Sequence, residues 1–177
     1  MAKEYRYTSA DELLRAGVQS QGRTVLHRLA EDAKFHQVPP ALLTRELLLH
    51  ADALGCTPLH VAATHGSLRQ LKRVLTSEML VWTKERSQCF TPLQLAAMTG
   101  HLDQIAPELL TPAMIMSSSE IDPRTVAEIL VEQHLDHLRK VLPSFKPEVR
   151  AIFAAVLTDS PDPKGNAEQS SRTARRA

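Results

Sequence analysis

A short unit that recurs every 33 or 34 positions constrains this chain more than any other feature. Residues 55–66 hold the clearest copy, GCTPLHVAATHG, and residues 91–102 restate it as TPLQLAAMTGHL. A looser copy, TVLHRLA, begins at Thr24, and a degenerate one, TVAEILV, begins at Thr125. A fixed period of this length indicates that one small structural unit is stacked on copies of itself.

Each clear copy contains the residues that begin and end a short helix. A threonine before Pro58 or Pro92 can cap the free N–H groups of the first turn, and proline suits that turn because its φ is already fixed. The alanines at 62–63 are small enough for a second helix to approach closely. Gly66 and Gly100 stand where the helix must turn, a position that favours φ > 0. The unit is therefore predicted to be a helix–turn–helix.

The Thr-Pro-Leu-His core at residues 57–60, together with this period, resembles the ankyrin-repeat family. The resemblance covers most of the chain and implies an all-α fold, an ankyrin-repeat α-solenoid of about four stacked repeats with a capping helix at each end. It also implies hydrogen bonds from the motif threonine to the motif histidine and from there to the neighbouring repeat. Mapped onto this sequence, repeats one to four occupy about residues 21–54, 55–88, 89–122 and 123–145.

An N-terminal cap is expected over residues 1–20. Ser9 and Glu12 have the spacing of a capping box, in which each side chain accepts a backbone N–H of the other. The apolar residues that follow predict one short helix from about Ala10 to Ala16, covering the open end of the first repeat.

A C-terminal cap helix is expected over residues 146–157, because Pro147 suits a first turn and apolar residues follow at helical spacing. Residues 158–177 contain no large apolar side chain. Since such a segment cannot offset its ordering entropy by burial, we expect a disordered tail. Residues 1–157 are then a single domain.

Two further patterns follow the motif. Pro40 and Pro107 stand at the same offset in repeats one and three, which predicts a kinked or split second helix there. Segments that begin at Thr44, Thr76 and Thr111 also align, and each predicts a threonine-capped turn with apolar residues. Ankyrin repeats commonly have a Gly-Ala-Asp-like turn at this place, so the chain departs from the family pattern here.

Composition excludes several classes of partner. A net charge of +1 over 177 residues gives no electrostatic basis for binding nucleic acid or an anionic membrane. The chain does not open on an apolar run, and no stretch reaches the roughly 18 apolar residues of a membrane span. Cys56 and Cys89 are too few for a disulfide framework, which fits a reducing cytoplasm. We therefore expect a cytoplasmic monomer.

Two groups of residues have the ingredients of a chemical site. His134, Asp136 and His137 are potential zinc ligands, but no further ligand lies at a suitable spacing, and we interpret them as an inter-helix turn. Cys56 and His60 form a nucleophile and a base, yet the repeat motif explains His60 and no third group orients the pair. No phosphate-binding loop, catalytic carboxylate pair or nucleophile elbow is present. The sequence predicts no enzyme and no metal or other cofactor.

The expected function is the binding of a partner protein through the concave face of the stack, centred on repeats two and three. The resemblance implies that hairpin tips and residues after the alanine pair make the contacts. Large apolar groups at such positions, Phe90 and Met98, suggest a buried contact, although local packing is the alternative interpretation for them and for Trp82, the only tryptophan. The candidate contact residues are Arg23, Glu31, Asp32, Cys56, Thr64, His65, Trp82, Phe90, Met98, Thr99, Arg124, Glu132 and Gln133.

Two other functions stay open at this point. A regulatory subunit or an enzyme with an unrecognised site would need a deep pocket with converging polar groups and strongly perturbed pKa values. A nucleic-acid-associated regulator would need a continuous basic face, whereas the charges here are scattered. The fold by itself does not identify the partner.

Overall fold

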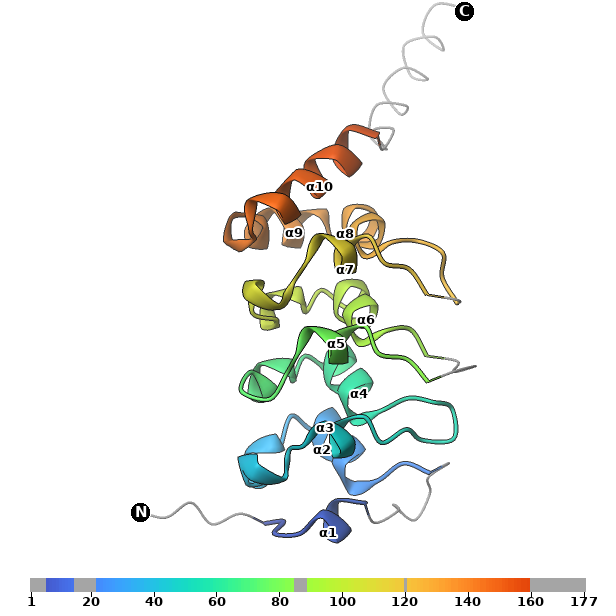
Figure 1. Cartoon of the computed structure of the whole chain (residues 1–177), viewed down its shortest axis with the longest axis vertical. Helices are drawn as coiled ribbons and strands as arrows, with labels where there is room; N and C mark the ends of the chain where they lie inside the picture. Colours follow the sequence, from blue (N-terminus) through green and yellow to red (C-terminus); the bar gives the residue numbers. More distant parts are fainter. Residues whose placement is uncertain (1–5, 15–21, 85–88, 120, 160–177) are drawn as a thin grey trace, which may run out of the picture.

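The computed structural model of the chain describes residues 6–14, 22–84, 89–119 and 121–159 as short helices joined by turns (Figure 1). No β-strand occurs among these residues, so this part of the chain is all-α, as predicted. None of the helices described is long and apolar enough to cross a membrane.

Four helices, each beginning after one of the motif threonines, lie one above another along the length of the molecule (Figure 1). Each contacts the next in the series, and the alanines of the motif are fully buried between them. The small side chains thus permit the close approach that their repetition predicts. These helices are α2 (Val25–Glu31), α4 (Pro58–His65), α6 (Pro92–Met98) and α8 (Val126–Gln133).

A capping box begins each of these four helices. At α4, the hydroxyl of Thr57 accepts the backbone N–H of His60, and Nδ1 of His60 accepts the backbone N–H of Thr57 at 3.1 Å. The Thr57 hydroxyl also lies 2.7 Å from that Nδ1 atom, and Thr24 makes the same contact with His27 at 2.9 Å. The expected threonine–histidine bond is confirmed in both repeats.

Glycine ends α4 in the left-handed conformation that its position predicts. Gly66 has a φ of 70° and donates its N–H to the carbonyl of Ala62. Gly100, which follows α6, has a φ of 75°. A Cβ atom at Gly66 would lie 2.8 Å from Nε2 of His101, so a side chain there would have to displace the His101 ring.

The second helix of the predicted unit is a 3₁₀ segment in each of the first three repeats. Pro40 and Pro107 each begin a separate 3₁₀ turn, which confirms that proline splits this part of repeats one and three. In repeat two, which lacks the proline, a single turn occupies this place. The segments are η1 (Phe35–Gln37) with η2 (Pro40–Leu42), η3 (Leu68–Leu71), and η4 (Leu102–Gln104) with η5 (Pro107–Leu109).

Short threonine-capped helices follow these turns, as predicted. The hydroxyls of Thr44, Thr76 and Thr111 each accept the backbone N–H three residues on, at 3.3–3.4 Å. Each helix buries its last two apolar side chains in the common core. These helices are α3 (Arg45–Leu48), α5 (Ser77–Leu80) and α7 (Pro112–Ile115).

A helix covers the N-terminal end of the stack. It is α1 (Ala10–Leu14), which contacts α2 and buries Leu13 completely. Ser9 and Glu12 form the predicted reciprocal bonds, with backbone-to-side-chain distances of 3.2 and 3.3 Å. The last part of the predicted helix, residues 15–16, lies outside the described residues.

The C-terminal end has a regular helical hairpin. After α8 come α9 (Leu135–Val141), η6 (Leu142–Ser144) and α10 (Pro147–Asp159), and α10 packs against α7 and α8. Its own side chains Val149 and Phe153 are fully buried in this contact. Helix α10 extends two residues into the segment 158–177, which was predicted to be disordered, because its last hydrogen-bonded turn continues past Leu157. Residues 160–177 lie outside the described part of the chain.

The motif threonines should contribute more to stability than the threonines that cap exposed turns. Thr57 is fully buried and its hydroxyl joins the His60 network, whereas Thr44 is exposed and caps one short helix. We expect Thr57→Val to lower the free energy of unfolding by about 2–3 kcal/mol and Thr44→Val by about 1 kcal/mol. Urea denaturation of both variants checks this, and equal losses would contradict the role given to the motif threonine.

Candidate functional site

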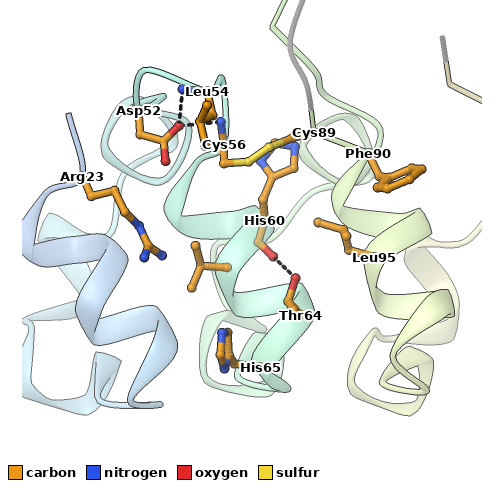
Figure 2. A pocket seen from close by; sticks show the side chains of 11 residues that line it. Arg23, Asp52, Leu54, Cys56, His60, Thr64, His65, Cys89, Phe90 and Leu95 are labelled. Carbon is orange, nitrogen blue, oxygen red and sulfur yellow. Dashed lines mark hydrogen bonds between the residues drawn. A yellow bond between two sulfur atoms is a disulfide. The ribbon is translucent and has the colours of Figure 1, made fainter. Parts of the chain in front are cut away.

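An open groove of about 430 Å³ lies across the first three repeats (Figure 2). Its walls come from α4, from the loops that precede α4 and α6, and from Arg23 and Leu95 on either side. The residues that line it are Arg23, Asp52, Leu54, Cys56, His60, Val61, Thr64, His65, Cys89, Phe90 and Leu95.

Five of the candidate contact residues meet in this groove: Arg23, Cys56, Thr64, His65 and Phe90. They come from three repeats, so the stacking of the helices is what brings them together. Thr64 and His65 are exposed at the end of α4, and Phe90 is half-buried before α6.

Glu31 and Asp32 lie at the end of α2, outside the groove lining. Glu31 is close enough to Arg23 for an ion pair, with 3.8 Å between the charged atoms. Asp32 accepts a hydrogen bond from Lys34 at 2.8 Å. Both carboxylates are exposed, and salt bridges in such positions contribute little to stability.

Met98 and Thr99 hold repeats together. The Thr99 hydroxyl donates to the carbonyl of Leu95 at 2.7 Å and is 3.2 Å from the carbonyl of Ala63 in the preceding repeat. The Met98 carbonyl accepts from Nε2 of His134 at 2.6 Å, and its side chain packs against the core. As candidates for partner contact, both remain predictions.

Arg124 is paired within its own loop. Its guanidinium donates to both carboxylate oxygens of Asp122 and to Glu132 at 2.9 Å. These hydrogen bonds from Arg124 hold the pKa of Asp122 below its ordinary value. Gln133 is exposed at the end of α8, and Trp82 packs edge-on against the His60 ring, with 6.2 Å between the centroids.

Asp52 shapes the loop that carries Leu54. Neither residue was among the candidates predicted from the sequence. One oxygen of the buried Asp52 carboxylate accepts the N–H groups of Leu54 and Cys56, each at 2.9 Å (Figure 2). Leu54 is left 45% exposed at the groove. An aspartate five residues before the motif threonine, followed by Gly55, is a turn signal that could have located this loop.

His60 lies at the base of the groove as a neutral ring. Its Nδ1 atom accepts the Thr57 N–H, so the proton is on Nε2. Burial is the main cause that lowers the pKa of His60 to about 4, against smaller opposing effects of Asp52 and the Phe90 carbonyl. Burial likewise lowers the pKa of His27, whose Nε2 atom lies 3.2 Å from the Cys56 carbonyl.

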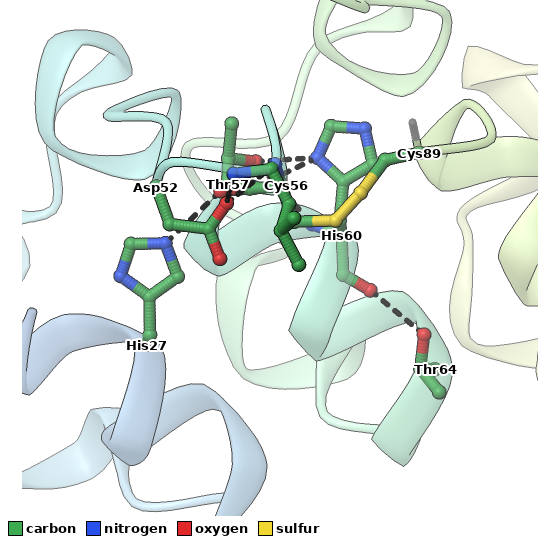
Figure 3. Close-up of a disulfide and its surroundings, with 8 residues drawn as sticks. His27, Asp52, Cys56, Thr57, His60, Thr64 and Cys89 are labelled. Carbon is green, nitrogen blue, oxygen red and sulfur yellow. Dashed lines mark hydrogen bonds between the residues drawn. A yellow bond between two sulfur atoms is a disulfide. The ribbon is translucent and has the colours of Figure 1, made fainter. Parts of the chain in front are cut away.

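A disulfide joins Cys56 to Cys89 at one wall of the groove (Figures 2 and 3). The two Cα atoms are 5.6 Å apart, within the range that such a bond needs. Two cysteines were too few to predict a disulfide framework, so this pair was not expected from the sequence. The signal was in the period, because a separation of 33 residues places both cysteines just before the motif threonine of adjacent repeats.

The groove can accept an apolar side chain with polar groups beside it. Leu54, Val61, Phe90 and Leu95 supply apolar surface, while Arg23, Thr64 and His65 are hydrogen-bonding groups at its margin. The Cys56 sulfur is bonded to Cys89 in this form, so Cys56 is not a free thiol beside His60. Within the described ranges no group of three or more His, Cys, Asp or Glu side chains could hold a metal ion.

Acid should destabilise the protein through His60. The unfolded side chain titrates near 6.5 and the folded one at about 4, so the unfolded state binds more protons between these values and stability falls as the pH is lowered through that window. We expect His60→Gln, which copies Gln94 of repeat three, to remove about 2–3 kcal/mol of the difference in unfolding free energy between about pH 7 and pH 4.5. Denaturation curves at the two pH values measure it; an unchanged pH dependence in the variant would refute the assignment.

The comparison with known proteins adds no family. The sequence matches no protein-family model, and no curated protein is significantly similar to it. The ankyrin resemblance therefore rests on the motif, its period and the capped helices described above.

Proposed function

We propose that this chain is a four-repeat ankyrin solenoid that binds a partner protein. The binding surface is its concave face, centred on the groove that crosses repeats one to three. The chain catalyses no reaction. Support comes from the period of 33 or 34 residues and from the capping box that begins all four motif helices. Because each helix packs on its neighbours, side chains from successive repeats are presented on one extended surface.

The observation that carries this proposal is the exposed apolar lining of the groove. Leu54 is held in the open by the Asp52 turn, and the half-buried ring of Phe90 lines the same groove. Partner side chains that covered these two residues would remove apolar surface from water, which is the main source of affinity at such a site. Arg23, Thr64 and His65 at the margin can orient that partner by hydrogen bonds.

A cytoplasmic, monomeric module without a cofactor completes the proposal. The net charge of +1 supports a protein partner over nucleic acid or a membrane surface. The chain has two cysteines, far fewer cysteines than the disulfide-dense domains typical of secreted proteins, which supports the cytoplasmic location.

Capture from the native cell extract tests the role of the groove, with Leu54→Asp as the probe. We expect the wild-type chain to retain a specific protein and the variant to lose at least about tenfold in affinity, because a buried carboxylate would replace an apolar contact. Titration of the captured protein against both chains measures the change.

Met116→Asp is the matched control. Met116 is 49% exposed, close to the 45% of Leu54, and lies outside the groove at the end of α7. Its variant should bind like the wild type, and circular dichroism should show both variants folded. Equal binding by the Leu54 variant would remove the groove from the interface.

A further inference from the structure

Three boundaries separate the four motif helices, and two of them share a hydrogen bond. At the first boundary Nε2 of His27 donates to the carbonyl of Cys56 at 3.2 Å. At the third, Nε2 of Gln94 donates to the carbonyl of Arg124 at 3.4 Å. In each case the acceptor is the residue just before the next motif threonine.

The middle boundary has no such bond. Nε2 of His60 is buried, and among the described residues it makes no hydrogen bond of the geometry found at the other two boundaries. The corresponding acceptor is the carbonyl of Phe90, whose weaker interaction with the ring raises the pKa of His60. An unpaired buried donor of this kind is costly, so something must hold the two groups apart.

The disulfide lies at this same boundary (Figure 3). Cys89 directly precedes Phe90 in the chain, and its bond to Cys56 fixes that segment against the loop before α4. A covalent tie thus stands where the neighbouring boundaries have a hydrogen bond.

We propose that Cys56 and Cys89 are a reversible thiol–disulfide exchange site, at which reduction exchanges the covalent tie for a hydrogen bond from His60 to the Phe90 carbonyl and thereby moves one wall of the groove. Both cysteines line the open groove, so a small thiol can approach them. Disulfides that form in a reducing compartment are typically transient and redox-sensing. The reducing compartment and the effect on partner binding both rest on the proposed function; the measurement of the exchange does not.

The reductant in this exchange is a small thiol, glutathione. Its thiolate attacks Sγ of Cys56, because Cys56 is half-buried and so more accessible than Cys89, which is 9% exposed. The attack forms a mixed disulfide between glutathione and Cys56, and Cys89 leaves as a thiolate. A second glutathione thiolate attacks the glutathione sulfur of the mixed disulfide and releases Cys56 as a thiolate with glutathione disulfide. Two electrons pass from two glutathione thiols to the protein, and their two protons end on the cysteines.

Trp82 provides an internal reporter of the change. It is the only tryptophan in the chain and packs edge-on against the His60 ring. Movement of that ring toward the Phe90 carbonyl alters the surroundings of the indole, so fluorescence can follow the exchange without any partner present.

The experiment equilibrates the native full chain with a series of reduced-to-oxidised glutathione ratios. Free thiols are trapped with N-ethylmaleimide and counted by intact mass, and Trp82 emission is recorded in parallel. We expect conversion from no added label to two labels within the series, a Trp82 emission shift with the same midpoint, and an unchanged far-ultraviolet circular dichroism spectrum. In the reduced form, NMR should show the His60 Nε2 proton shifted downfield and protected from exchange.

Controls separate this site from a plain structural bond. Cys56→Ser/Cys89→Ser should show no fluorescence response to glutathione, and His60→Gln should still exchange its disulfide while losing the imidazole NMR signal. A bond that resists glutathione until denaturant is added would overturn the proposal, as would full reduction without any change at Trp82 or His60. None of these readouts uses a partner, so a failed capture experiment would leave them intact.

Discussion

The interaction on which this structure depends is the reciprocal bond between the motif threonine and the side chain three residues later. That pair satisfies free N–H groups at the start of each motif helix, as Thr57 and His60 do at α4. At the first and third boundaries the same side chain reaches the following repeat, through His27 and Gln94. One local contact therefore both begins a helix and sets its distance from the next.

Much of the fold could be predicted from the sequence because its rules are local. Threonine caps, proline at the first turn and the left-handed Gly66 are decided within a few residues, and the structure confirms them. The 3₁₀ form of the second helix in each repeat was harder to predict. Proline indicated a break in repeats one and three, but η3 in repeat two is also 3₁₀ and no proline indicates it. The end of α10 was also misplaced, since apolar spacing reports burial and not the last hydrogen-bonded turn.

The candidate site was less predictable than the fold because it depends on contacts between repeats. Mapping by family position found Phe90 and Thr64 in the groove, but it could not distinguish them from Thr99, whose hydroxyl bonds the preceding repeat. Leu54 was missed because a single leucine in a loop carries no periodic signal. The pairing of Cys56 with Cys89 follows from their similar positions in adjacent repeats, which becomes meaningful only once the stacking is known.

The cross-link also has a mechanical consequence for the whole stack. In the described part of the chain, the main contacts of each motif helix are with the next one along the stack, and such an array can open from either end. The disulfide joins the loops that precede α4 and α6, so these two helices must open together. It closes one ring of chain between two cysteines that are 33 positions apart. Fraying is then concentrated in the terminal units, α1 with α2 and α8 with α10, while the part of the molecule that contains the groove persists as its most durable segment.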